Sequence, residues 1–208
     1  MRLLRLTLIT CILFIPGPAF AQSWIEYTSR QDLFRASFPG EPTVEDVSYT
    51  SQYEAEYPAR AYTRQNGESR YSITVVDHTD AERIFTERGI SGHSECQARC
   101  WIVDRYAAPS HAANQFLTRA AKVTHFGYSR TDLIGGYQIQ LVNPDQSQSF
   151  VEIHMHEDRL YIQEATVPAG APLPMIFGPS LRILDEEGNS IRYQSDYMNG
   201  YPAPPRTR

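Results

Sequence analysis

The sequence has 208 residues, of which 41% are hydrophobic and 21% are charged, with a formal net charge of −5 at pH 7. This length and composition suit one domain that can bury about 70% of the surface its unfolded chain exposes. The acidic balance, together with arginines that form no basic cluster, argues against nucleic acid and anionic membranes as partners.

The first 21 residues match a secretory signal peptide. Arg2 and Arg5 precede an apolar run from Leu6 to Ile15, and Ala19-Phe20-Ala21 supplies small residues for cleavage. The run is much shorter than the roughly 20 residues that cross a bilayer as a helix. Lipidation at Cys11 is the alternative, although Thr10 fits that motif poorly. We expect cleavage after Ala21, no integral membrane segment afterwards, and a periplasmic or secreted protein whose net charge is −7, because the excised part carries two arginines and no acid.

The mature chain opens with β patterns. Trp24 to Tyr27 and Leu33 to Phe38 alternate apolar and polar side chains, which predicts two strands of a half-buried sheet. Val44 to Tyr49 and Ala59 to Thr63 predict edge strands. Arg70 to Asp77 is dense in β-branched residues and predicts a central strand.

Three stretches predict helices. Thr79-Asp80-Ala81-Glu82 matches a capping box, and the helix it begins is expected to end near Arg88. A loop over Ile90 to Cys100 is expected to precede a second helix over Ser110 to Ala121, and Pro109 just before it suits the start of a helix. Leu173 to Leu184 predicts a third helix, with Pro179 either kinking it or starting it late.

The remaining strands lead to the clearest pattern in the chain. His125 to Tyr128 and Tyr137 to Val142 predict strands, and Phe150 to Ala165 predicts a strand–turn–strand hairpin. Residues 195–208 form a tail rich in proline and tyrosine, which we expect to be non-helical and to lie on the surface.

Two cysteines remain after the signal peptide is removed. Cys96 and Cys100 form an even pair in a compartment where disulfides persist, so we expect them to be bonded. A metal site is the competing interpretation, but zinc takes four ligands and His93 is the only other candidate nearby.

The hairpin also holds the most suggestive chemical motif, His154-Met155-His156. If Val151, Ile153 and Met155 face the core, then Glu152, His154 and His156 share the opposite face at steps of about 7 Å. One carboxylate and two imidazoles could then bind one metal ion. The alternative is a solvated or helix-covered strand face with no ligand.

Other catalytic patterns are weaker. A hydrolase would need a nucleophile, a base and an orienting acid, but the chain has no G-x-S-x-G motif. Ser110, beside His111, is better explained as a helix cap, and Asp77-His78-x-Asp80 as a strand-to-helix corner. We therefore predict no catalytic residue, and no cofactor.

A resemblance rests on short stretches spread along the mature chain. They are Trp24 to Tyr27, Phe38-Pro39-Gly40-Glu41-Pro42, Arg70 to Asp77, Ala121 to His125, Thr166 to Gly170 and Asn199 to Pro205. In these residues the chain resembles a family of uncharacterised exported bacterial proteins. The aromatic first strand followed by F-P-x-x-P is also similar, more distantly, to the start of PsbP-like domains.

The resemblance implies a central antiparallel sheet with helices on both faces, and binding or assembly in place of catalysis. We therefore expect residues 22–194 to form a single α+β domain, a mainly antiparallel central sheet with helices packed on it as in a PsbP-like α/β/α sandwich. The expected function is a non-enzymatic binding or assembly module for an envelope protein or a small molecule. A metal-binding protein or metal-dependent enzyme that uses Glu152, His154 and His156 is the alternative.

Overall fold

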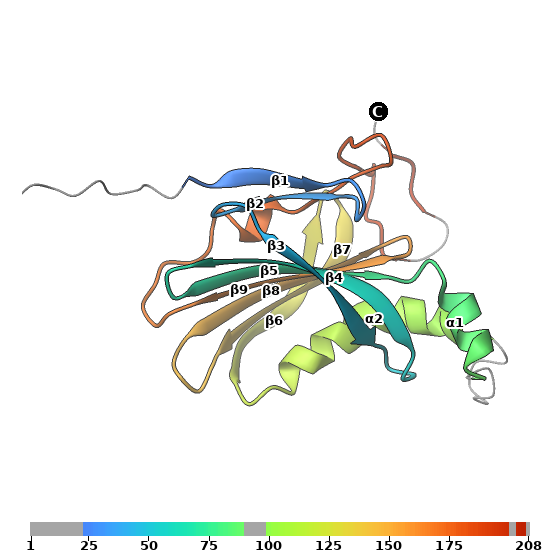
Figure 1. Cartoon of the computed structure of the whole chain (residues 1–208), viewed down its shortest axis with the longest axis horizontal. Coiled ribbons are helices and arrows are strands. Elements are labelled where there is room, and N and C mark those ends of the chain that lie inside the picture. The colour runs from blue at the N-terminus through green and yellow to red at the C-terminus, as the bar shows by residue number, and fades with distance from the viewer. Residues whose placement is uncertain (1–22, 90–98, 200–202, 207–208) are drawn as a thin grey trace, which may run out of the picture.

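A seven-stranded antiparallel sheet runs through the middle of the structure (Figure 1). The computed structural model describes residues 23–89, 99–199 and 203–206, so the predicted signal peptide and Cys96 lie outside the described residues. The sheet order is β3 (Thr43–Thr50), β4 (Glu56–Asn66), β5 (Ser69–Asp77), β9 (Arg159–Val167), β8 (Gln148–His156), β7 (Ile134–Val142) and β6 (Lys122–Thr131).

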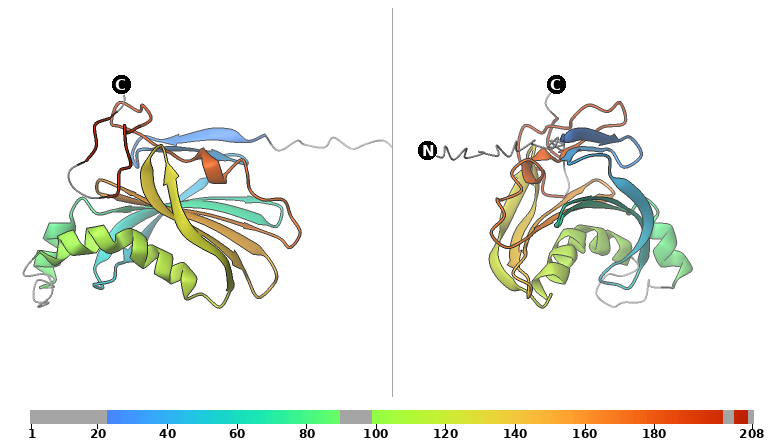
Figure 2. Two further views of the ribbon diagram at one scale, coloured as in Figure 1. Left: turned by 180° about the vertical axis from the view of Figure 1, so that it is seen from behind. Right: turned by 60° about the vertical axis from the view of Figure 1, so that its left-hand side comes forward.

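Different layers cover the two faces of this sheet. The helices α1 (Ala81–Glu87) and α2 (Cys100–Leu117) lie on one face. A three-stranded sheet of β1 (Ile25–Ser29), β2 (Phe34–Phe38) and β10 (Arg182–Ile183) lies on the other, with the 3-10 turn η2 (Gly178–Ser180). Two further views show α2 and the β1–β2 hairpin on opposite sides (Figure 2).

The α+β class and the mainly antiparallel sheet are therefore confirmed, whereas the expected α/β/α layering is not. In the described part of the chain, α-helices pack on one face only. Strand pairing of β2 with β1 and β10 builds the second covering layer as a small sheet. Its buried Phe34 and Phe38 pack against Tyr62 and Phe177, so aromatic side chains fill the space that a helix would occupy.

The predicted hairpin is confirmed as β8 and β9. They pair from Gln148↔Val167 to His156↔Arg159 around a two-residue turn, in which Glu157 adopts a positive φ of 52°. The predicted central strand is β5, which lies between β4 and β9. The edge prediction holds for β3 but is wrong for β4, which has a partner on each side.

The second helix begins earlier than predicted. It runs from Cys100, so Pro109 lies inside it and does not begin it. Proline has no N–H to bond the carbonyl of Arg105, one turn back. The side chain of Asn199 donates to that carbonyl instead, at 3.3 Å. Buried Cys100, Asp104 and Ala108, spaced four residues apart, keep one face of the early turns against the sheet.

The third predicted helix is wrong. Between Leu173 and Leu184 only η2 is helical, and β10 follows it. Pro174 and Pro179 remove two backbone donors from this stretch, which disfavours a continuous helix. The first helix is confirmed over Ala81–Glu87, but its N-cap, Asp80, makes no side-chain cap bond, so the predicted capping box does not form.

The C-terminal tail is less exposed than expected. Tyr197 is buried and pairs with Ile134 in a parallel bridge, while the neighbouring Met198 is exposed. Tyr197 stacks on Tyr193, with ring centroids 4.9 Å apart. Aromatic packing therefore anchors this part of the tail to the body. No helix in the described ranges is long and apolar enough to span a membrane.

Candidate functional site: a pocket on the sheet face opposite α2

A pocket of about 200 Å³ lies on the sheet face opposite α2. Strands β7, β8 and β9 form one side of it, and the segment 173–179 forms the other. The lining residues are Gln138, Gln140, Phe150, Val151, Glu152, Gln163, Ala165, Leu173, Pro174, Met175, Phe177, Gly178 and Pro179. Most of these side chains are apolar, with three amides and one carboxylate among them.

The alternation of β8 places the predicted residues on this face. Val151, Ile153 and Met155 are fully buried in the core under α2, as their apolar character predicts. Successive strand residues point to opposite faces. Glu152 and His154 therefore lie on the pocket side of the strand.

Strand register brings the polar lining residues into one row. Gln138 on β7 lies opposite Glu152 on β8, and Glu152 lies opposite Gln163 on β9. Gln138 Nε2 donates to Glu152 Oε1 at 3.2 Å. The row places two amides beside the single charged side chain of the pocket lining.

Gln163 also ties the strand to the segment across the pocket. Its Nε2 donates to the carbonyl of Phe177 at 2.8 Å, whereas its buried Oε1 has no partner among the described residues. The ring of Phe177 packs edge-on against Phe38 and Tyr71, at 5.3 and 5.2 Å. These contacts fix the far side of the pocket to both sheets.

His154 is fully buried next to Glu152. Its Nε2 lies 3.5 Å from Glu152 Oε2, and neither ring nitrogen makes a hydrogen bond within the described structure. Gly136 lies opposite His154 on β7, where an added Cβ would come within 2.6 Å of Nδ1 and 2.0 Å of the Ile153 carbonyl oxygen. Glycine is therefore required for this imidazole to lie over the strand.

His156 belongs to a different cluster. Its Nε2 lies 2.8 Å from the hydroxyl of Tyr193, and its ring also packs on Tyr197. Burial, with Arg206 and Arg159 nearby, lowers the pKa of His156 to about 4. The ring is therefore neutral at pH 7 and helps to hold the C-terminal segment.

The structure thus brings Glu152 and His154 together but directs His156 elsewhere. In the part of the chain that is described, no group of three or more His, Cys, Asp or Glu side chains is placed to hold a metal ion. Metal binding by Glu152, His154 and His156 stays a prediction. So does the Cys96–Cys100 disulfide, because Cys96 lies outside the described residues; Cys100 is buried at the start of α2.

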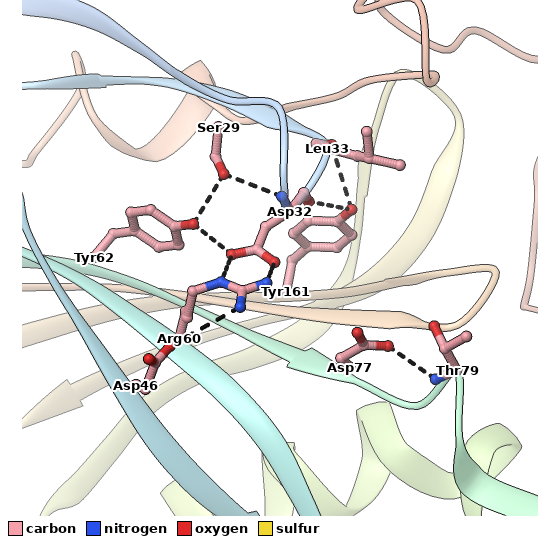
Figure 3. A network of polar contacts seen from close by, with 9 residues as sticks. All are labelled: Ser29, Asp32, Leu33, Asp46, Arg60, Tyr62, Asp77, Thr79 and Tyr161. Atoms are coloured by element: carbon pink, nitrogen blue, oxygen red, sulfur yellow. Dashed lines mark hydrogen bonds and ion pairs between the residues drawn. The ribbon is translucent and has the colours of Figure 1, made fainter.

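A second polar cluster on this face is structural (Figure 3). Asp32, in the turn between β1 and β2, is buried and accepts two hydrogen bonds from the Arg60 guanidinium. Tyr62 also donates to Asp32, and its own hydroxyl contacts Ser29. Burial, followed by the bond to Asp32, raises the pKa of Tyr62 to about 12. Protein donors therefore engage both oxygens of the Asp32 carboxylate.

The predicted corner at Asp77 and His78 is confirmed. The backbone N–H of Thr79 donates to Asp77 Oδ1 at 2.9 Å, which turns the chain from β5 toward α1 (Figure 3). His78 is buried against the ring of Tyr57, 4.2 Å between centroids, and burial lowers its pKa to about 4. Tyr57 in turn donates to Asp104 on α2. No sequence motif indicated this contact.

Ser110 and His111 do not act as a pair. Ser110 lies inside α2, where its hydroxyl donates to the carbonyl of Ala107, so the helix-cap interpretation is wrong. His111 Nε2 lies 3.1 Å from Gln115 Nε2 one turn along. Both side chains are occupied by contacts within their own helix.

Sequence reasoning missed most of the pocket. Gln138 and Gln140 share a face of β7, and Gln163 stands in the predicted hairpin, so each amide could be placed on a strand. Their alignment depends on pairing between strands that are distant in sequence, and the opposite wall depends on the misassigned segment 173–179.

Comparison with known proteins gives a likeness of backbone. No protein-family model and no curated protein sequence matches the chain. Among solved structures, the chain is similar to the solution structure of cyanobacterial PsbP (CyanoP) from Synechocystis sp. PCC 6803, with a TM-score of 0.43 and 10% sequence identity. The match covers 80% of this chain and 96% of that chain. No property of CyanoP is assigned to this chain.

Proposed function

We propose that the protein is an exported, non-enzymatic binding module and that the pocket on β7, β8 and β9 holds a small ligand. One observation carries the proposal: a concave, mainly apolar pocket with a few converging polar groups, Glu152, Gln138 and Gln163. Binding sites for small molecules have this composition. Export rests on the signal peptide expected in residues 1–21. A small molecule is preferred over an envelope protein because the feature is a pocket and not a flat surface.

The proposal is tested by titrating isotope-labelled mature protein with a library of small organic fragments and following backbone amide shifts. Saturable shifts are expected in β7, β8, β9 and the segment 173–179. Gln140→Trp should abolish them by filling the pocket from a partly exposed position. Glu45→Trp, on the exposed edge strand β3, is the matched control and should keep them.

Two outcomes would contradict the proposal. One is that no fragment gives saturable shifts in the lining residues. The other is that Glu45→Trp removes binding as completely as Gln140→Trp, which would place the ligand elsewhere or show that the tryptophans act through folding.

Metal binding is a second candidate function, favoured by the buried ring nitrogens of His154 and their proximity to Glu152. Elemental analysis should then find stoichiometric Zn, Cu or Ni, and added metal should raise the melting temperature. His154→Asn should remove that rise, and His156→Asn, whose ring contacts Tyr193, should keep it. Absence of both bound metal and a metal-dependent rise eliminates this candidate.

A further inference from the structure

We propose that the ligand of this pocket is a small amphipathic cation, with an ammonium group at Glu152 and an apolar body against the segment 173–179. This inference rests on the proposed function, since it names the ligand class for the same pocket. Four features of the pocket carry it: one carboxylate without a Lys or Arg partner among the described residues, one free acceptor, one partly exposed aromatic ring and an exposed apolar rim.

The charge of the pocket is one-sided. Among the described residues, Glu152 is the only charged one in the lining, and its side chain is 18% exposed. Within the described residues, His154 is its only ion-pair partner within 4 Å, and neither Lys nor Arg contacts it. A carboxylate this far out of water is costly without a partner. A ligand cation would supply the missing positive charge.

The acceptors beside Glu152 suit a group that donates several hydrogen bonds. Gln163 is 2% exposed, and its Oε1 has no partner in the described structure, while its Nε2 is held by Phe177. A buried acceptor without a hydrogen bond is destabilising. An ammonium group carries donors only, so it can serve Glu152 and Gln163 together.

One partly exposed aromatic ring lines the same pocket. Phe150 on β8 lies two residues before Glu152, on the same face of the strand. The face of an aromatic ring attracts a cation and has no such attraction for an anion. Phe150 therefore favours the same sign of ligand charge as Glu152 does, whereas Phe177, which is fully buried, only supports the opposite wall.

The rim supplies the apolar part of the site. Leu173 is 53% exposed and Met175 is 68% exposed, both in the segment that lines the pocket. Burying these side chains under a ligand gains free energy in proportion to the apolar area covered. The volume of about 200 Å³ exceeds the ~150 Å³ engineered cavity that accommodates benzene. A ring or short alkyl chain beside the ammonium group therefore fits.

Charge also opposes the alternatives. An acid of the same size would place a second negative charge beside Glu152, and the described lining residues include no Lys or Arg to pair with it. The chain as a whole carries a net charge of −5, which attracts cations over long range and repels anions.

The test compares three probes of similar shape by calorimetry and amide shifts: 2-phenylethylamine, 2-phenylethanol and 3-phenylpropionate. We expect the amine to bind at least about tenfold more tightly than the alcohol, which corresponds to about 1.4 kcal/mol. The acid should bind most weakly. Added salt should weaken the amine more than the alcohol, because only the amine makes a charge pair.

Paired variants locate the charge. Glu152→Gln should lower the affinity for the amine to that for the alcohol. Glu164→Gln is the matched control: Glu164 lies next to Gln163 on β9, faces the helix side where it pairs with Arg119, and is 15% exposed. It should leave the preference for the amine unchanged. Unaltered thermal melting of Glu152→Gln separates loss of charge from loss of fold.

Equal binding of amine and alcohol, or an amine preference that survives Glu152→Gln, overturns this inference while leaving the pocket as a binding site. Failure of all three probes to bind also overturns it. The proposed function is tested separately by the fragment titration and its Gln140→Trp and Glu45→Trp variants, which can support the pocket even when all three probes fail to bind.

Discussion

The two faces of the seven-stranded sheet differ in what packs on them. On the helix side of β8, Val151, Ile153 and Met155 pack without exposed area under the small side chains of α2. On the other side, the same strand carries Glu152 and His154 beside a pocket, and the covering layer is attached through buried aromatic side chains and the buried Asp32 cluster. Apolar packing tolerates changes in side-chain shape, whereas buried polar groups need particular partners. Both faces therefore contribute to stability, and the face opposite the helices also carries the pocket that we propose to bind a ligand.

The largest expected effect tests the attachment. Asp32→Ala leaves Arg60 and Tyr62 without their shared acceptor, so it should lower the free energy of unfolding by about 4 kcal/mol. Urea unfolding followed by circular dichroism measures the loss. Asp46→Ala is the control, because Asp46 also pairs with Arg60, at 3.9 Å, but its side chain is 90% exposed. It should cost less than about 1 kcal/mol, and equal losses would refute the structural role of Asp32.

The next effect tests the helix face. Met155→Ala should cost about 3 kcal/mol, since Met155 is fully buried and its removal leaves a cavity under α2. Because Met155 points away from the pocket, the affinity for a bound fragment should stay within about twofold of the native value, well below the tenfold change of 1.4 kcal/mol. Chemical denaturation and fragment titration of the same variant measure the two quantities. A large loss of affinity would show that the two faces are coupled.

Lowering the pH tests the packing of both faces, because each face buries one histidine with a lowered pKa. Burial lowers the pKa of His78 on the helix side and of His156 on the opposite side to about 4, against 6.5 for an ordinary histidine. The unfolded chain therefore binds more protons between these values, so stability is present above pH 6.5 and is lost as pH falls toward 4. Each histidine should contribute a loss of about 3 kcal/mol.

Unfolding experiments at a series of pH values check this slope. His78→Gln and His156→Gln should each remove about half of the loss that the histidines cause, whereas His125→Gln, exposed on β6, should leave it unchanged. Burial raises the pKa of Asp104, which increases the stability of the folded chain as pH falls and so opposes the effect of the histidines. Each variant is therefore compared with the native chain at every pH. A pH dependence that is the same in His78→Gln, His156→Gln and the native chain would contradict the burial of both rings.

The sequence predicts the hairpin and the helix face better than the pocket face. Strict alternation through Val151, Ile153 and Met155 defines both the strand and its buried side, so these local patterns predict β8 and β9 well. Where the prediction fails, the decisive contacts are non-local. Pro109 resembles a helix start until Asn199, from the tail, is known to replace its missing hydrogen bond.

The pocket depends on non-local contacts even more strongly. Glu152 could be predicted as a surface-facing carboxylate, but its alignment with Gln138 and Gln163 requires the register of three strands. The far wall requires Phe177 to be anchored between two sheets, where periodicity alone predicted a helix. The alternation of apolar and polar residues predicts which face of a strand lies in the core. The surroundings of the other face depend on segments that are distant in the sequence.

The smallest expected effect tests the contact between the tail and the helix layer. Asn199→Ala should cost about 1 kcal/mol, because the Arg105 carbonyl loses the donor that compensates for Pro109. In a Pro109→Ala background the restored N–H can bond that carbonyl within the helix, so the same change should cost less than about 0.5 kcal/mol. Urea unfolding of the two single variants and the double variant measures this coupling. Equal costs in both backgrounds would mean that Asn199 does not replace the bond that proline removes, and that the early start of α2 rests on packing alone.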